Sequence, residues 1–118
     1  MTGIVFFRTA RREAVIEFYQ DVLEFQQWLE QDGGCTILQR DNLLVGFCDA
    51  DESETEGIVT VAVEDRAAVD RLYDDLDGHA RHPPEENADF DIYQFFAEDP
   101  DGRAVEVQTF LHETPPIS

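Results

Sequence analysis

The chain repeats a pattern of apolar residues at a shift of 54 positions, and this repeat constrains the fold more than any other sequence feature. Ile4-Val5 corresponds to Ile58-Val59 at this shift. The apolar positions of two amphipathic helices then coincide, because both follow the i, i+3, i+4, i+7 spacing. These positions are Val15, Phe18, Tyr19 and Val22, and Val69, Leu72, Tyr73 and Leu76. The sequence therefore predicts two copies of one unit, each beginning with a strand and a helix.

Three further strands are expected after the helix of each unit. Asp32-Gly33-Gly34 and Asp41-Asn42 are typical of hairpin turns, whereas Pro83–Asn87 predicts a longer connection. Asp65 is well placed to cap the second helix and Thr9 to cap the first. The expected elements are strand Gly3–Arg8, helix Ala10–Leu23 and strands Gln26–Glu30, Cys35–Arg40 and Leu43–Asp49, then strand Gly57–Val63, helix Arg66–Leu76 and strands His79–His82, Phe90–Glu98 and Arg103–Phe110.

A chain of 118 residues is expected to form one domain with a substantial hydrophobic core. The repeat divides this domain into residues 1–50 and residues 57–112. Residues 51–56 read Asp-Glu-Ser-Glu-Thr-Glu and predict a polar linker between the two units. Residues 113–118 contain two consecutive prolines and predict a loose tail.

The last hairpin of the second unit contains the most distinctive polar motif. Asp99-Pro100-Asp101-Gly102 predicts a turn, because the proline presets φ and the glycine tolerates a positive φ. In the strand that follows, Glu106 points away from Val105 and Val107. This hairpin aligns with the last hairpin of the first unit at a shift of 60 residues, so that Gly46 corresponds to Glu106.

Three features, taken together, resemble the vicinal oxygen chelate superfamily, which includes glyoxalase I, bleomycin resistance proteins and extradiol dioxygenases. Phe18–Phe25 is similar to the family pattern Phe-Tyr-x-x-x-Leu-Gly-Phe, although Glu24 stands where the family usually has glycine. The turn at Asp99–Gly102 followed by Glu106 is similar to the last hairpin of the family, and the repeat is similar to its tandem modules. The resemblance implies an α+β fold in which tandem βαβββ units form a curved mixed-sheet cup with helices on the outer face.

The resemblance also implies four strand positions that hold a divalent metal in some members of the family. Glu106 matches one of them, but the other three correspond to Gly46, Gly3-Ile4 and Gly57-Ile58, whose side chains bind no metal. A divalent ion in a protein needs three or four ligands. We therefore expect no metal cofactor, with Glu106 as a ligand only if a divalent metal binds through other residues. The three histidines, His79, His82 and His112, are interpreted as surface residues.

Strand alternation predicts which residues line the cup. If Glu106 faces inward, the same alternation places five other residues there, namely Leu44, Gly46, Cys48, Ala104 and Gln108. Half of the aromatic residues on other strands would add walls, drawn from Trp28, Tyr93, Phe95 and Phe96. This mostly apolar lining suits a small organic molecule that is apolar or planar.

Two functions follow from this interpretation. The first is a metal-free module that binds and sequesters a small organic molecule, with Glu106 as its polar anchor. The alternative is a metal-dependent lyase, isomerase or dioxygenase-type enzyme that uses Glu106 as ligand or general base. Glu106 is the one candidate catalytic residue, because no nucleophile and base pair is evident in the sequence.

The charge of the chain excludes several partners. The sequence has 27 acidic residues against 8 basic ones, for a net charge of -19, and all basic residues are arginine. Nucleic acid and anionic membrane surfaces are therefore not expected partners. A folded chain with this composition resembles proteins of extreme halophiles. The expected partners are a small molecule and a second copy of the chain, since members of the family commonly form dimers.

The remaining expectations concern location and the two cysteines. No apolar run has the length of a membrane span and no signal peptide is evident, so we expect a cytoplasmic protein. Cys35 and Cys48 are too few for a disulfide framework and are interpreted as small buried apolar residues.

Removing salt should expand the protein, because the repulsion among its carboxylates is screened within about 3 Å only at about 1 M salt. A circular dichroism titration from molar to millimolar potassium chloride should show a loss of folded structure at the low end. An unchanged spectrum over this range would contradict a halophilic adaptation.

Overall fold

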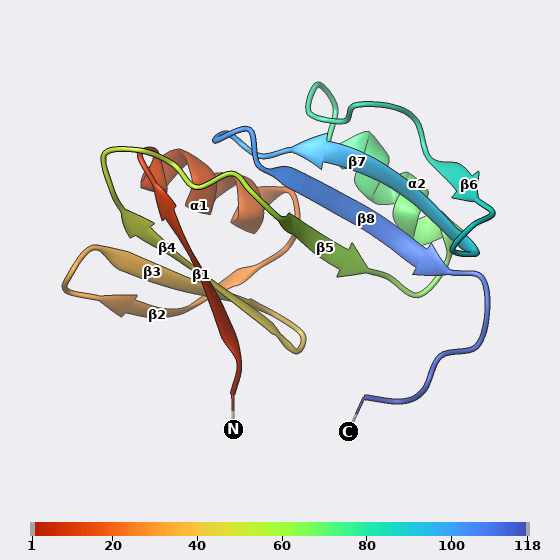
Figure 1. Cartoon of the computed structure of the whole chain (residues 1–118), viewed down its shortest axis with the longest axis horizontal. Helices are drawn as coiled ribbons and strands as arrows, with labels where there is room; N and C mark the ends of the chain where they lie inside the picture. Colours follow the sequence, from red (N-terminus) through yellow and green to blue (C-terminus); the bar gives the residue numbers. More distant parts are fainter. Residues whose placement is uncertain (1, 118) are drawn as a thin grey trace. The chain divides into compact units, whose positions relative to one another are not determined.

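The computed structural model describes residues 2–117, and it contains two four-stranded sheets with one helix each (Figure 1). The chain divides into two compact units. Unit 1 contains the described residues up to Glu56 together with Asp99–Arg103. Unit 2 contains Gly57–Glu98 and the described residues from Ala104 onward. The turn predicted within the last hairpin thus belongs to the first unit, while its two strands belong to the second.

Unit 1 is a βαβββ unit with a mixed sheet of order β1-β4-β3-β2. Strand β1 runs parallel to β4, and the other neighbours are antiparallel. Helix α1 packs through the ring of Tyr19, which lies 5.0 Å from the ring of Phe47 on β4. The elements of unit 1 are β1 (Ile4–Thr9), α1 (Arg12–Asp21), β2 (Gln26–Gln31), β3 (Cys35–Arg40) and β4 (Leu43–Asp49).

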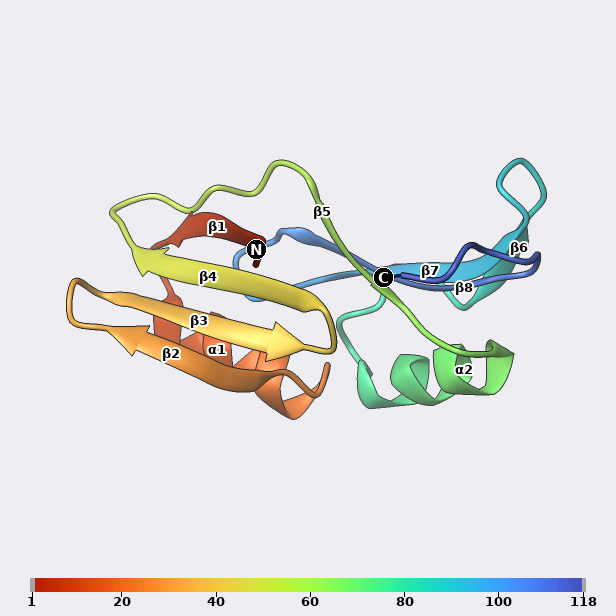
Figure 2. The same ribbon diagram turned by 90° about the horizontal axis from the view of Figure 1, so that it is seen from below.

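Unit 2 repeats this arrangement with the sheet order β5-β8-β7-β6. Strand β5 runs parallel to β8, and Figure 2 shows α2 along one face of the second sheet. Asp65 caps the N-terminus of α2, because its carboxylate accepts a hydrogen bond of 2.8 Å from the backbone N–H of Ala68. The elements of unit 2 are β5 (Ile58–Ala62), α2 (Arg66–Asp75), β6 (Glu85–Asn87), β7 (Ile92–Glu98) and β8 (Ala104–Phe110).

The predicted α+β fold with two βαβββ units is therefore confirmed, and so is the cap at Asp65. The two units also share one register. Phe6 pairs with Gly46 in unit 1, and Thr60 pairs with Glu106 in unit 2. Gly46 and Glu106, which the sequence alignment matches at a shift of 60 residues, therefore hold equivalent positions in the two sheets.

Three local predictions are wrong. The strand expected at His79–His82 is reduced to one isolated bridge at Ala80, and the short strand β6 lies instead within Pro83–Asn87. Asn87 can join the sheet there because the two prolines precede the paired residues, so no ladder N–H is lost. Thr9 does not cap α1, which begins after Arg11 with no side-chain cap.

The interpretation of the two cysteines as buried apolar residues is also wrong. Cys35 and Cys48 form a disulfide between directly opposed positions of β3 and β4, and both are partly exposed. The sequence separation of 13 residues is a loop for which chain entropy gives a stabilisation of about 3 kcal/mol. Disulfides persist mainly in oxidising compartments, so this one does not favour the predicted cytoplasmic location. That location stays a prediction. No helix within residues 2–117 is long and apolar enough to cross a membrane.

A fully buried guanidinium organises the centre of unit 1. Arg103 donates a hydrogen bond of 2.7 Å to Asp99 and another of 3.0 Å to the carbonyl oxygen of Glu54. The aromatic rings of Phe7 and Phe47 lie 4.6 and 5.3 Å from its Cζ atom. The charge of Arg103 is therefore neutralised by the carboxylates of Asp99 and Asp101, and two neighbouring aromatic rings add cation–π contacts.

The carboxylate of Asp99 completes this cluster. It accepts a 2.8 Å hydrogen bond from the hydroxyl of Tyr19 and a further one from the backbone N–H of Arg103. Burial and the neighbouring Asp99 charge raise the pKa of Tyr19, so its hydroxyl stays a neutral donor. Gly102 permits the tight turn because its φ is +84°.

Replacing Arg103 with methionine should lower the free energy of unfolding by about 3–5 kcal/mol, because Asp99 would stay buried without its counter-ion. Arg71→Met is the matched control, since the Arg71 side chain is 64% exposed and forms only a long, exposed ion pair of 4.0 Å with Glu64. Its effect should stay within about 0.5 kcal/mol. Urea denaturation in concentrated potassium chloride measures both variants, and equal losses would refute a central role for Arg103.

Candidate functional site

The candidate site lies on the face of the second sheet that carries Glu106. Val105 and Val107 are fully buried, and β8 packs against α2. Strand alternation places Glu106 and Gln108 on the opposite face. Glu106 sits between β5 and β7, opposite Thr60 on one side and Phe96 on the other.

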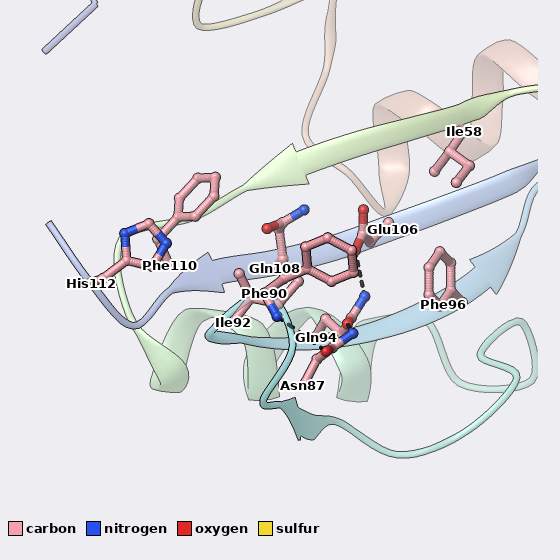
Figure 3. Close-up of a pocket in the computed structure, with 10 residues that line it drawn as sticks. All are labelled: Ile58, Asn87, Phe90, Ile92, Gln94, Phe96, Glu106, Gln108, Phe110 and His112. Atoms are coloured by element: carbon pink, nitrogen blue, oxygen red, sulfur yellow. Dashed lines mark hydrogen bonds between the residues drawn. The ribbon is translucent and has the colours of Figure 1, made fainter. Parts of the chain in front are cut away.

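Neutral hydrogen-bond donors hold the carboxylate of Glu106. The hydroxyl of Thr60 donates to Oε1 at 2.9 Å, and the side-chain amide of Gln94 donates to Oε2. Asn87 donates a 2.8 Å hydrogen bond to the side-chain oxygen of Gln94, which orients the amide nitrogen of Gln94 toward Glu106 (Figure 3). Glu106 is 8% exposed and Gln94 is 5% exposed, so the polar floor of the site is largely dry.

A cavity of about 560 Å³ opens above this floor. Its volume falls in the range of small-molecule sites, about 300–1,000 Å³. Ile58, Phe90 and Phe110 stand around it with 54%, 70% and 45% of their surface exposed. The residues that line the cavity are Ile58, Asn87, Phe90, Ile92, Gln94, Phe96, Glu106, Gln108, Phe110 and His112, all of unit 2 (Figure 3).

Two polar residues position the aromatic walls. The side-chain oxygen of Asn87 accepts hydrogen bonds of 3.1 and 3.4 Å from the backbone N–H groups of Asp89 and Phe90. Nε2 of His82 accepts a 3.3 Å hydrogen bond from the backbone N–H of Phe96. Asn87 thus supports both the polar floor, through Gln94, and the turn that holds Phe90.

In unit 1 an aromatic ring occupies the position equivalent to the side chain of Glu106. A Cβ atom built on Gly46 would lie 2.4 Å from the ring of Phe6, so the ring occupies the space that a side chain would fill. Phe6 corresponds to Thr60 in the repeat, and Ile37 of β3 pairs with Gly46. Thr60 and Glu106 of unit 2 are therefore replaced in unit 1 by Phe6 and Gly46, and Phe96 is replaced by Ile37.

The structure distributes the expected lining residues over both units. Glu106 and Gln108 line the cavity of unit 2, and Ala104 is not among the described residues that do. Leu44, Gly46 and Cys48 belong to β4 of unit 1, where Cys48 is part of the disulfide. Of the aromatic residues, Phe96 lines the cavity, whereas Phe95 packs on Tyr73 and Tyr93 donates to Asp70.

Sequence reasoning missed the donors around Glu106. The repeat contains a signal for Thr60. The first strand of each unit pairs with the last one, and the 54- and 60-residue shifts align the pair Thr60 and Glu106 with the pair Phe6 and Gly46. Gln94 and Asn87 gave no such signal. Asn87 sits in a segment that was expected to be a loop, and the facing of Gln94 depends on the register between β7 and β8.

Comparison with solved structures identifies the fold. A glyoxalase/bleomycin resistance protein/dioxygenase from Nocardioides matches with a TM-score of 0.75 at 18% identity, over 100% of this chain and 88% of that one. A family enzyme from Burkholderia phytofirmans matches with 0.79 at 20% identity, over 92% and 97%. This chain has the glyoxalase/bleomycin resistance/dioxygenase fold.

Other proteins with the glyoxalase/bleomycin resistance/dioxygenase fold include a lactoylglutathione lyase from Agrobacterium tumefaciens, with a TM-score of 0.76 at 18% identity over 92% of each chain. The resemblance seen in the sequence is thus confirmed at the level of the fold. The sequence itself matches no model of a protein family and no characterised protein. The function therefore has to be argued from the cavity.

The residues around Glu106 do not fit the divalent metal site that the family resemblance implies. Its polar neighbours are the hydroxyl of Thr60 and the amide of Gln94, and the expected opening position is Ile58. Within residues 2–117, no group of three His, Cys, Asp or Glu side chains is placed to hold a metal ion. One carboxylate falls short of the three or four ligands of a divalent site.

Proposed function

We propose that this protein binds a small organic molecule in the cavity of unit 2, without a metal, and with Glu106 as the polar anchor. The protein would act by sequestering this molecule. The observation that carries the proposal is an open, mostly apolar cavity of about 560 Å³ above the buried carboxylate of Glu106, around which residues 2–117 supply no group of metal ligands.

The exposed apolar side chains around the cavity support this proposal. Ile58, Phe90 and Phe110 leave about half of their surface or more in water, which is an unfavourable arrangement that a bound apolar molecule would relieve. They surround a floor on which the side chains of Glu106 and Gln94 are held in place by hydrogen bonds. This combination of apolar walls and a few fixed polar groups is typical of small-molecule sites.

Naphthylmethanol is a suitable neutral probe, and isothermal titration calorimetry should detect its binding with a stoichiometry of one per chain. Ile58→Asn should weaken binding about tenfold, because the mouth of the cavity loses part of its apolar surface. Val5→Asn is the matched control, since Val5 is 53% exposed on the equivalent strand of unit 1 against 54% for Ile58. Its affinity should equal that of the unchanged protein.

Metal analysis after dialysis tests the other half of the proposal. The dialysed protein should contain no stoichiometric divalent metal, and naphthylmethanol should bind equally with and without a chelator. A stoichiometric metal ion that Glu106→Gln removes would contradict the proposal and favour a metal-dependent enzyme.

A further inference from the structure

We infer that the cavity of unit 2 selects apolar, ring-containing molecules that carry a protonated amine, with Glu106 as the counter-ion of the amine. This inference rests on the proposed function and names the class of molecule that the same site takes. It comes from the contrast between Glu106 and the buried carboxylates that pair with Arg103 in the described part of the chain.

Asp99, Asp101 and Glu106 carry buried carboxylates among the described residues. The side chains of Asp99 and Asp101 are 0% and 1% exposed and both pair with Arg103, whereas Glu106 is 8% exposed. Asp99 forms an ion pair of 2.7 Å with the buried Arg103. Glu106 has no basic side chain within ion-pair distance in the described part of the chain, and accepts only from a hydroxyl and an amide. A buried charge without a counter-ion is costly, so a cation that reaches Glu106 gains more than a neutral group.

The hydrogen bonds around Glu106 restrict what a bound molecule can offer. Asn87 holds the oxygen of the Gln94 amide, so the nitrogen of that amide points to Glu106. A carboxylate has about four acceptor positions, of which the protein uses two. The free positions accept further hydrogen bonds from a donor. A second carboxylate or a carbonyl oxygen at this place would meet an acceptor and a like partial charge.

The walls fit the rest of such a molecule. The cavity is lined by Phe90, Phe96 and Phe110, whose ring faces attract cations as well as apolar groups. An ammonium group that touches Glu106 from within this cavity therefore finds a carboxylate in a cavity with aromatic walls. Gln108 adds one uncharged polar group on the same face of β8.

Three probes of one shape and different charge test this inference, namely naphthylmethylamine, naphthylmethanol and naphthoate. Calorimetry in about 1 M potassium chloride limits attraction to the general negative charge of the protein, because the Debye length is about 3 Å. At a pH of about 8 the amine of naphthylmethylamine is charged. The amine should bind at least about tenfold more tightly than the alcohol, and naphthoate more weakly than both.

Two variants separate the cavity from the surface. Glu106→Gln should reduce the preference for the amine over the alcohol to about twofold or less. Glu64→Gln removes one exposed carboxylate of unit 2, whose side chain is 73% exposed, and should retain the full preference. If Glu106→Gln does not fold, Glu106→Asp serves as the second variant, because the shortened side chain withdraws the carboxylate and should also reduce the preference.

The outcomes distinguish this inference from the proposed function. Equal binding of all three probes, or a preference that survives at Glu106→Gln, would overturn the selection of amines and leave the binding function standing. Absence of binding for all three probes would overturn the proposed function itself. A preference that Glu106→Gln abolishes and Glu64→Gln retains is the result that the structure predicts.

Discussion

The fold depends on the buried guanidinium of Arg103. Its hydrogen bonds and its two aromatic neighbours hold the turn Asp99–Arg103 in unit 1, although the strands on either side of the turn belong to unit 2. Glu106 follows only three residues later, on β8. The ion pair with Asp99 thus closes the turn that directly precedes the strand carrying the candidate site. A buried ion pair stabilises a protein mainly by the penalty for breaking it, so this arrangement tolerates little change.

The two halves of the repeat have kept one backbone and acquired different surfaces. At the same register position, unit 2 has Thr60, Glu106 and Phe96, and unit 1 has Phe6, Gly46 and Ile37. In unit 1 the ring of Phe6 fills the space above Gly46. In unit 2 the equivalent space is open and polar at its floor. The same backbone thus holds an aromatic ring at this position in unit 1 and an open polar floor in unit 2.

The repeat made most of the fold predictable, because strand alternation and helical spacing occur twice at matching positions. It also showed that Gly46 is the counterpart of Glu106. The partners of Glu106 were less accessible, since Gln94 and Asn87 face it only through the pairing of three strands. The disulfide was missed for a similar reason. Cys35 and Cys48 become opposed only when the register of β3 and β4 is known, and a count of two cysteines gives no hint of it.

The central claim is that the cavity above Glu106 is the binding site of this protein. A titration of ¹⁵N-labelled protein with naphthylmethylamine, followed by heteronuclear NMR, tests it most directly. We predict shifts of the backbone amides of Thr60, Gln94 and Glu106 and of the side-chain amide of Gln94, with unit 1 unchanged. Shifts that cluster on β1–β4, or a spectrum that does not change at all, would contradict the account.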